Sequence, residues 1–196
     1  MSDALRPLWD FDDLDATAGR LRALRAEALT QLARVQGLRE DYDGGDRLLD
    51  EVTDDDPRVR VRVDLERGRL RRSSGDNEAA LPLFERAFAA AVEAAEDWLA
   101  ADAAHMAALA APDRDGFVTW TNRGLELAER SPAAAYWAGP ILNNLGWEHF
   151  DAEEYEQALA VFQRALAVRE QDPANPAAIE HAREAVAEAL KALGRG

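Results

Sequence analysis

The stretch ILNNLGWEHFDAEEYEQALAVFQRALAVRE, residues 141–170, contains two amphipathic segments separated by a short polar turn. Gly146 is followed, 12, 16 and 19 positions later, by a small residue, an aromatic residue and a second small residue: Ala158, Phe162 and Ala165. These three positions form one stripe on a helix, and a glycine allows a neighbouring helix to approach closely. The spacing therefore predicts two antiparallel helices joined by a tight turn.

The same spacing occurs earlier in the chain. The three offsets lead from Gly68 to Ala80, Phe84 and Ala87, and from Ala33 to Gly45, Leu49 and Val52. A weaker unit fills the interval between residues 95 and 135. With Ala104 as its small residue, the offsets lead to Gly116 and Trp120, whereas Arg123 does not fit. A register shifted by one or two residues is the alternative for this third unit.

These repeats resemble the tetratricopeptide repeat family, whose unit is about 34 residues long. The resemblance is best in the last unit, through the pair Leu145 and Gly146 and through Tyr155. That unit looks like the longer-period repeats of kinesin light chains and bacterial regulatory proteins. It departs from the family where His149 replaces an aromatic residue and where the closing proline, Pro173, comes late. The resemblance implies an all-α fold, an α-α superhelix (solenoid) of about four helix-turn-helix repeats with a C-terminal capping helix.

We expect a single domain over residues 1–196. Acidic residues precede a stripe of leucines, which predicts an additional N-terminal helix or an extension of the first repeat. Near the C-terminus, Asn175 is a candidate N-cap, and Pro176 suits a first helical turn. The expected divisions are a helical extension at 1–25, repeats at 26–59, 61–94, 97–133 and 139–172, and a capping helix at 174–194.

Composition excludes several classes of partner. The chain has 196 residues, a formal charge of −15 and no cysteine, and its pI is near 4.6. Nucleic acids and anionic membranes favour a surplus of basic residues, so neither is expected as a partner. Disulfides and thiolate metal sites are excluded. The N-terminus lacks the order of a signal peptide, and no apolar run approaches a membrane span, so we expect a cytoplasmic protein. All but one of the basic residues are arginine, which indicates a GC-rich bacterial gene.

The resemblance also indicates where a ligand should bind. In tetratricopeptide arrays the first helix of each repeat lines a concave groove with the side opposite its packing stripe. In the last unit that stripe includes Leu142 and Leu145, so Asn144 and Trp147 point the other way, with Asn143 beside them. Equivalent positions in the other units complete the candidate peptide-binding groove: Gln31, Arg34, Arg62, Glu66, Arg69, Asp102, His105, Asn143, Asn144 and Trp147.

The chemistry of these side chains favours a peptide. Asparagine amides bond an extended backbone without reading its side chains. Arginine offers a planar fork for a carboxylate or phosphate, and tryptophan is enriched at binding hot spots. We therefore expect a non-catalytic scaffold that binds a protein or peptide with an acidic group. The alternative for Trp147 is packing or an oligomer contact, which would make the chain a self-associating structural module.

The run RVRVRVDLERGRLRR, residues 58–72, contains seven arginines. Its content of arginine resembles that of a nucleic-acid-binding patch. The alternation in RVRVRVDL resembles a β-strand. Folded as a helix the run scatters the arginines: Arg62 and Arg69 point to the groove, whereas Arg60 and Arg71 lie near the packing side and either snorkel or pair with acids. The helix is the interpretation that we favour. Three other large residues are expected in the core: Trp98, Trp120 and Trp137.

A third alternative is an enzyme or small-ligand receptor that uses Asp102 and His105, which lie three residues apart on one predicted helix. An oriented acid and histidine can act in proton transfer. No hydroxyl nucleophile or second histidine lies near them in the sequence, and the chain has no glycine-rich phosphate loop. We expect no cofactor, no metal and no catalytic residue.

Overall fold

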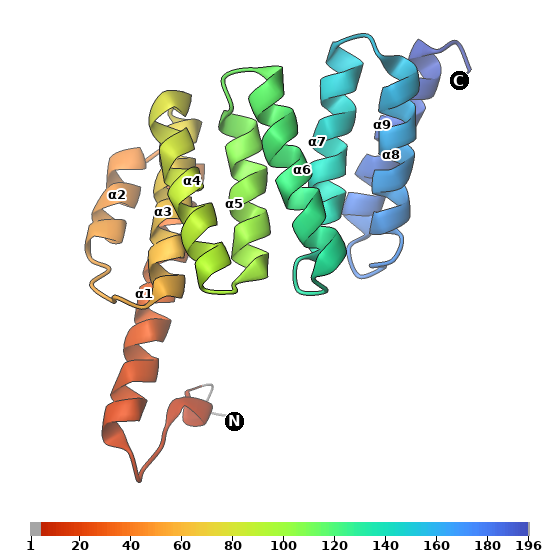
Figure 1. Ribbon diagram of the computed structural model, residues 1–196. Coiled ribbons are helices and arrows are strands. Elements are labelled where there is room, and N and C mark those ends of the chain that lie inside the picture. The colour runs from red at the N-terminus through yellow and green to blue at the C-terminus, as the bar shows by residue number, and fades with distance from the viewer. Residues whose placement is uncertain (1–4, 196) are drawn as a thin grey trace. The chain divides into compact units, whose positions relative to one another are not determined.

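The computed structural model describes residues 5–195 of the chain. Every regular element in this part is helical (Figure 1), so the all-α helical-repeat fold is confirmed. The α-helices are α1 Leu14–Leu38, α2 Tyr42–Asp50, α3 Pro57–Ser73, α4 Asn77–Glu93, α5 Asp97–Ala110, α6 Arg114–Arg130, α7 Ala138–Asp151, α8 Tyr155–Arg169 and α9 Pro176–Ala192. Two short 3-10 helices accompany them, η1 Arg6–Leu8 and η2 Ala135–Trp137.

Contacts between residues divide the chain into two compact units, residues 1–99 and 100–196. In the first unit α1 packs against α2 and α3, and α3 packs against α4. In the second unit α6 packs against α7, α7 against α8, and α8 against α9. The expected division into four repeats stays a prediction, and its first four residues lie outside the described part. No helix among the described residues is both long and apolar enough to cross a membrane.

Polar side chains determine where several helices begin. An Asp or Asn accepts a hydrogen bond from the backbone N–H three residues later at the starts of α1, α2, α4, α6 and α9: Asp13, Asp41, Asp76, Asp113 and Asn175. Such a cap stabilises a helix by about 1 kcal/mol. Asn175 is therefore the N-cap that the sequence predicts, and Pro176 opens α9.

Three of the tight turns share one backbone conformation. Glu40, Gly75 and Glu153 have φ of 65°, 89° and 60°. The N–H of the next residue then donates to a carbonyl five residues earlier: Asp41 to Gln36, Asp76 to Arg71 and Glu154 to His149. At the equivalent position of the α5–α6 turn the chain has Pro112, whose ring fixes φ at a negative value. The α5–α6 turn must therefore have a different backbone conformation at this position.

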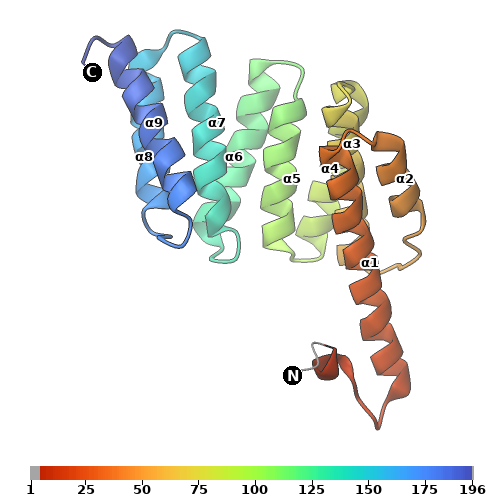
Figure 2. The ribbon, with the colours of Figure 1, turned by 180° about the vertical axis from the view of Figure 1, so that it is seen from behind.

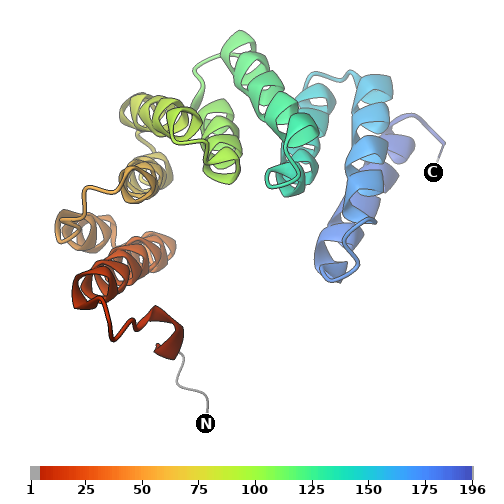
Figure 3. The same ribbon diagram turned by 60° about the horizontal axis from the view of Figure 1, so that its bottom comes forward.

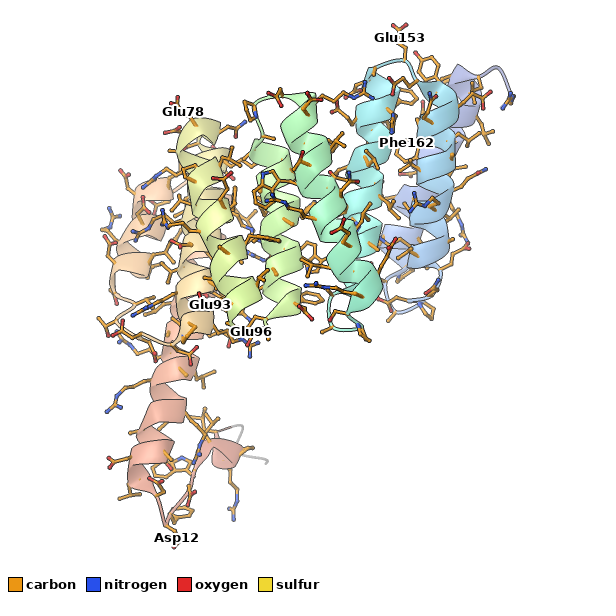
Figure 4. The ribbon with its side chains drawn as sticks, viewed as in Figure 1. Asp12, Glu78, Glu93, Glu96, Glu153 and Phe162 are labelled. Carbon is orange, nitrogen blue, oxygen red and sulfur yellow. The ribbon has the colours of Figure 1, made fainter. Side chains whose placement is uncertain are left out.

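Helix pairs α3–α4 and α7–α8 close as the small and aromatic spacing predicts. A Cβ atom built on Gly68 would lie 2.5 Å from Phe84, and one on Gly146 would lie 2.3 Å from Phe162. Both phenylalanines have no exposed surface. Figure 4 labels Phe162 on α8, beside α7. The two glycines are required because each aromatic ring occupies the space of a side chain.

The register of the third unit differs by one residue from the expected one. Gly116 is only partly buried and Arg123 is exposed, whereas Phe117, Thr121 and Gly124 are buried. Measured from the N-cap, these buried positions match the stripes of α2, α4 and α8. The first assignment was wrong because it was anchored on a small residue of α5, although the N-cap sets the register of the second helix.

The tryptophans expected in the core have different environments. Trp120 is 8% exposed, as predicted, and Arg123 lies 4.3 Å from its ring centroid. Trp137 is partly buried. Trp98 is 40% exposed, so the prediction that it belongs to the core is wrong.

The two terminal helices differ in character. α1 is continuous from Leu14 to Leu38, so the N-terminal extension is part of the first repeat's helix. Figure 2 shows that it extends past the ends of α2 and α3. The preceding segment folds back on it, since the Asp10 N–H donates to Thr17 Oγ1 and Arg20 Nε donates to the Leu8 carbonyl. At the other end α9 buries three alanines against α8: Ala182, Ala185 and Ala189.

Candidate functional site

In the first unit, three of the predicted groove residues bond one another. Arg34 donates two hydrogen bonds to Glu66, of 3.0 and 2.6 Å, and Arg69 donates a third of 2.8 Å. The Glu66 side chain is 3% exposed and that of Arg34 is 39% exposed. A carboxylate with these three charge-assisted bonds holds α1 to α3. The arginine forks are thus already occupied by a carboxylate of the same chain.

The other basic groups of this region are also paired. Arg62 lies 3.1 Å from Glu27 of α1, while Gln31 is exposed. Four further arginines of the α3 run have acidic neighbours: Arg58 with Glu96, Arg60 with Asp55, Arg67 with Asp50, and Arg71 with Asp46. The predictions that this run is a helix and that Arg60 and Arg71 pair with acids are confirmed. Its charge is distributed over ion pairs rather than collected into a patch.

In the second unit, His105 of α5 and Asn144 of α7 come together. His105 Nε2 lies 2.8 Å from Asn144 Nδ2. The His105 ring also lies 5.4 Å from the ring of Trp137, measured between centroids. An amide nitrogen can only donate, so this bond uses the lone pair of Nε2. Asp102, one turn earlier on α5, is 5% exposed and offers a ligand little surface.

One pocket opens beside Asn144, and we call it the histidine pocket. Its volume is about 350 Å³. It is lined by His105, Leu109, Gly139, Pro140, Asn143, Asn144, Ala165, Arg169, Ala178, His181 and Ala182. None of these described lining residues carries a carboxylate, although the whole chain has a charge of −15. The pocket therefore combines a permanent cation, two imidazoles and two amides, which suits an anionic group.

Gly139 determines how Arg169 enters the histidine pocket. A Cβ atom on Gly139 would lie 2.6 Å from Arg169 Nε, so the guanidinium lies directly over the first turn of α7. Arg169 Cζ also lies 5.3 Å from the ring centroid of Tyr136, which favours a cation. A glycine and an aromatic ring thus fix the arginine against the start of α7.

A second pocket lies on the other side of Asn144, and we call it the tryptophan pocket. Its volume is about 430 Å³. Phe117 and Trp147 provide aromatic surface, and the charged lining groups are mostly acidic: Asp113, Glu148 and Asp151, with Arg114. Leu109 and Asn144 line both pockets. The two pockets are therefore adjacent and differ in charge.

Trp147 both packs and lines this pocket. Its ring lies 5.0 Å from that of Phe162 and 5.3 Å from that of Phe150, between centroids. It packs against the buried cluster of α8 and α9 that contains Phe162. Trp147 was expected to line the groove, with packing as the alternative, and it does both. A ring held this way presents a rigid edge to the pocket.

A charged cluster joins α6 to the α7–α8 turn at the edge of the tryptophan pocket. Arg114 donates two hydrogen bonds to Glu154, and His149 Nδ1 lies 2.5 Å from the same carboxylate. Bonding to Arg114 first, and then to His149, lowers the pKa of Glu154 from 4.5 to about 2. The cluster therefore forms a charged link between the start of α6 and the α7–α8 turn.

Sequence reasoning missed Arg169, His181 and Arg114, because it considered only the first helix of each repeat. Arg169 ends α8, His181 lies on α9, and Arg114 opens α6. One signal was present in the sequence. Gly139 stands in the first turn of a helix, before a proline, where a missing side chain indicates close approach of another group.

A larger pocket, of about 760 Å³, lies in the first unit between α1 and the loop that leads to α3. Its charged lining residues have both signs: Arg20, Arg22, Arg25, Glu51, Asp54, Asp55 and Asp56. It contains no predicted groove residue. We place the candidate site at the two smaller pockets because predicted groove residues, His105, Asn144 and Trp147 among them, line these pockets.

Comparison with known proteins agrees with this fold. A family model described as tetratricopeptide repeat matches residues 141–171. A search of curated protein sequences finds no match. The crystal structure of BtubC (BKLC) from P. vanneervenii is similar, with a TM-score of 0.70 and 19% identity, over 90% of this chain and 75% of that one.

Two further structures come from Podosopora anserina and contain nearly identical TPR-like repeats of a putative kinesin light chain. One of them, a point variant, has a TM-score of 0.59, and the other has 0.58; each is 16% identical to this chain. Both cover 87% of this chain, and it covers 87% and 88% of them. The chain therefore carries a tetratricopeptide repeat at residues 141–171 and has the fold of tetratricopeptide-like repeat proteins.

Proposed function

We propose that the protein is a non-catalytic scaffold that binds a peptide segment of another protein across Asn144. The observation that carries this proposal is the pair of adjacent pockets on either side of that residue. The Asn144 side chain is held through its bond to His105, so its amide oxygen can accept an N–H from an extended peptide without reordering. A fixed amide between two pockets suits recognition of a backbone with a side chain on each side.

The lining of the histidine pocket indicates that the proposed ligand carries an acidic group. A carboxylate there meets the Arg169 guanidinium, which Gly139 and Tyr136 already hold in place. Pre-organisation lowers the entropy lost on binding. The neighbouring tryptophan pocket, with its acidic lining, favours an apolar or basic side chain on the other side of Asn144.

The proposed site omits the arginines of the first unit. Arg34 and Arg69 already share Glu66, and a ligand carboxylate would have to compete with this partly buried ion pair for them. Their bonds serve the packing of α1 on α3. The candidate groove is therefore limited to the residues that line the two pockets, which come from α5, α6, α7, α8 and α9 and from the turn before α6.

A displayed library of random peptides provides the test. The library is selected on the wild-type protein and on a variant with Asn144→Ala and Arg169→Gln. Arg164→Gln, which also removes one arginine from α8 at an exposed position, is the matched control. We expect wild type and control to enrich the same acidic motif, and the double variant to lose it.

Circular dichroism first establishes that all three proteins have equal helicity. Enrichment of the same peptides by the double variant would overturn the assignment of the site. Failure of wild type to enrich any motif would overturn the scaffold function itself. The two failures are therefore distinguishable.

A further inference from the structure

Helix α1 carries a second apolar face that the fold does not use. Leu14, Leu21, Leu24, Ala28, Val35 and Leu38 are spaced by seven, three, four, seven and three residues, and we call them the outer stripe. This spacing follows the heptad pattern by which one helix packs along another, with a period of 3.5 residues, and the two remaining core positions of the pattern are Thr17 and Gln31. Several members are exposed: Leu14 by 64%, Leu24 by 43%, Val35 by 39% and Leu38 by 81%.

The outer stripe lies opposite the face that α1 buries. The buried residues Ala26, Leu29, Thr30 and Ala33 centre on one side of the helix, and at 100° per residue the stripe centres on the other. Within the first unit, α1 contacts α2, α3 and η1 (Figure 3). Packing on α2 and α3 explains one apolar face of α1. On the opposite face the segment that precedes α1 covers Thr17, whereas Leu14, Leu24, Val35 and Leu38 stay exposed.

The helix at the opposite end of the chain shows the contrast. The exposed side of α9 is polar and charged, with Glu180, Arg183, Glu184 and Glu188. Among the described residues, most of the exposed large apolar side chains instead belong to residues 5–38. Contiguous exposed apolar surface of this kind marks an interaction site.

The charges beside the outer stripe indicate which partner fits. Arg20, Arg25 and Arg39 flank the stripe at the positions that set partner choice between paired helices. Arg20 Nε donates to a carbonyl, and the Arg25 side chain, 64% exposed, lies 3.6 Å from Glu51. The one acid on these flanks, Glu27, is paired with Arg62. The positions of α1 that flank the stripe are therefore mostly basic, while the loop beside Arg20 and Arg25 supplies Glu51, Asp54, Asp55 and Asp56.

We infer that the outer stripe of α1 docks an amphipathic helix of a partner protein, with apolar heptad positions and acidic flanks. A second copy of this chain fits less well, because a pair of α1 helices would set arginines against arginines and bring two charges of −15 together. Acidic flanks on the partner would instead meet Arg20, Arg25 and Arg39. The outer stripe shares no residue with the two pockets beside Asn144.

The test uses a labelled synthetic helix of four heptads, with leucine at the two apolar positions and glutamate on both flanks. Binding to the full chain is measured by fluorescence anisotropy. We expect saturable binding that weakens at least tenfold in a variant with Leu24→Asp and Val35→Asp. Val92→Asp, at a residue of α4 that is 44% exposed, is the matched control and should bind as wild type does. A peptide with lysine flanks should bind at least tenfold more weakly.

The replaced side chains are exposed, and a milder variant with Leu24→Ala and Val35→Ala guards against misfolding. Equal binding by wild type and both stripe variants would overturn the proposal, as would equal binding of the lysine peptide or no saturable binding. Sedimentation velocity tests whether the chain self-associates through the outer stripe. A wild-type dimer that the stripe variants dissociate would show that the occupant is a second copy and would also overturn it.

Discussion

At the scale of single residues, two glycines explain why the helix pairs close so tightly. Phe162 Cε1 lies 2.3 Å from the place where a Cβ atom on Gly146 would stand. We expect Gly146→Ala to destabilise the protein by about 2 kcal/mol, since the phenylalanine is fully buried and must move. Denaturant unfolding followed by circular dichroism measures this change.

Gly19→Ala is the matched control for this prediction. Gly19 lies within α1, and no atom stands within 4 Å of its Cβ position. Alanine there should stabilise the helix by up to about 1 kcal/mol. If both substitutions had the same sign, close approach would not be the reason for Gly146.

The exposed tip of the α7–α8 turn stores a small strain. Glu153 has φ of 60° and stands at the end of the turn (Figure 4). Left-handed backbone costs a residue with a side chain about 1–2 kcal/mol, and a glycine loses roughly 0.5–1 kcal/mol more in backbone entropy. We expect Glu153→Gly to raise the free energy of unfolding by about 0.5 kcal/mol. Gly75→Ala, at the equivalent turn with φ of 89°, should lower it. Destabilisation by Glu153→Gly would contradict this account.

At the scale of elements, the carboxylate of Glu154 links α6 to the α7–α8 turn. Its pKa falls from 4.5 to about 2 in the folded protein, through Arg114 and then His149. Because the folded pKa is the lower one, this stabilisation is present above pH 4.5 and is lost as the pH falls toward 2. We expect the difference in Tm between wild type and Glu154→Gln to shrink over that range.

Thermal melts of wild type and variant at a series of pH values test this prediction. Glu153→Gln, in the same turn, is the matched control. A difference between wild type and Glu154→Gln that stays constant from about pH 6 to about pH 2 would show that the link to Arg114 does not contribute.

At the scale of the whole molecule, the sequence predicts the fold because the offsets between small and aromatic residues follow from helix packing: a glycine on one helix leaves space for an aromatic ring of the next. Gly68 with Phe84 and Gly146 with Phe162 show this. The third unit was assigned one residue early, since its α6 stripe includes Thr121 and Gly124 and has no aromatic at the usual place.

The candidate site was predicted less completely. Asn143, Asn144 and His105 line one pocket, but Arg169 and His181 reach it from the following helices. The sequence rule considered only the first helix of each repeat, so it could not identify side chains that reach the pocket from α8 or α9. Burial of Glu66 beneath Arg34 also depends on the geometry between helices, which spacing along one helix does not specify.

The most direct test of the central claim is a double-mutant cycle by calorimetry between Arg169 and the acidic residue of a selected peptide. Wild type and Arg169→Gln are each titrated with the peptide and with its Glu→Gln or Asp→Asn version. We predict a coupling free energy of at least about 1 kcal/mol, because the carboxylate and the guanidinium meet in the histidine pocket. Additive losses, with a coupling near zero, would show that the acidic group binds elsewhere and would contradict the account.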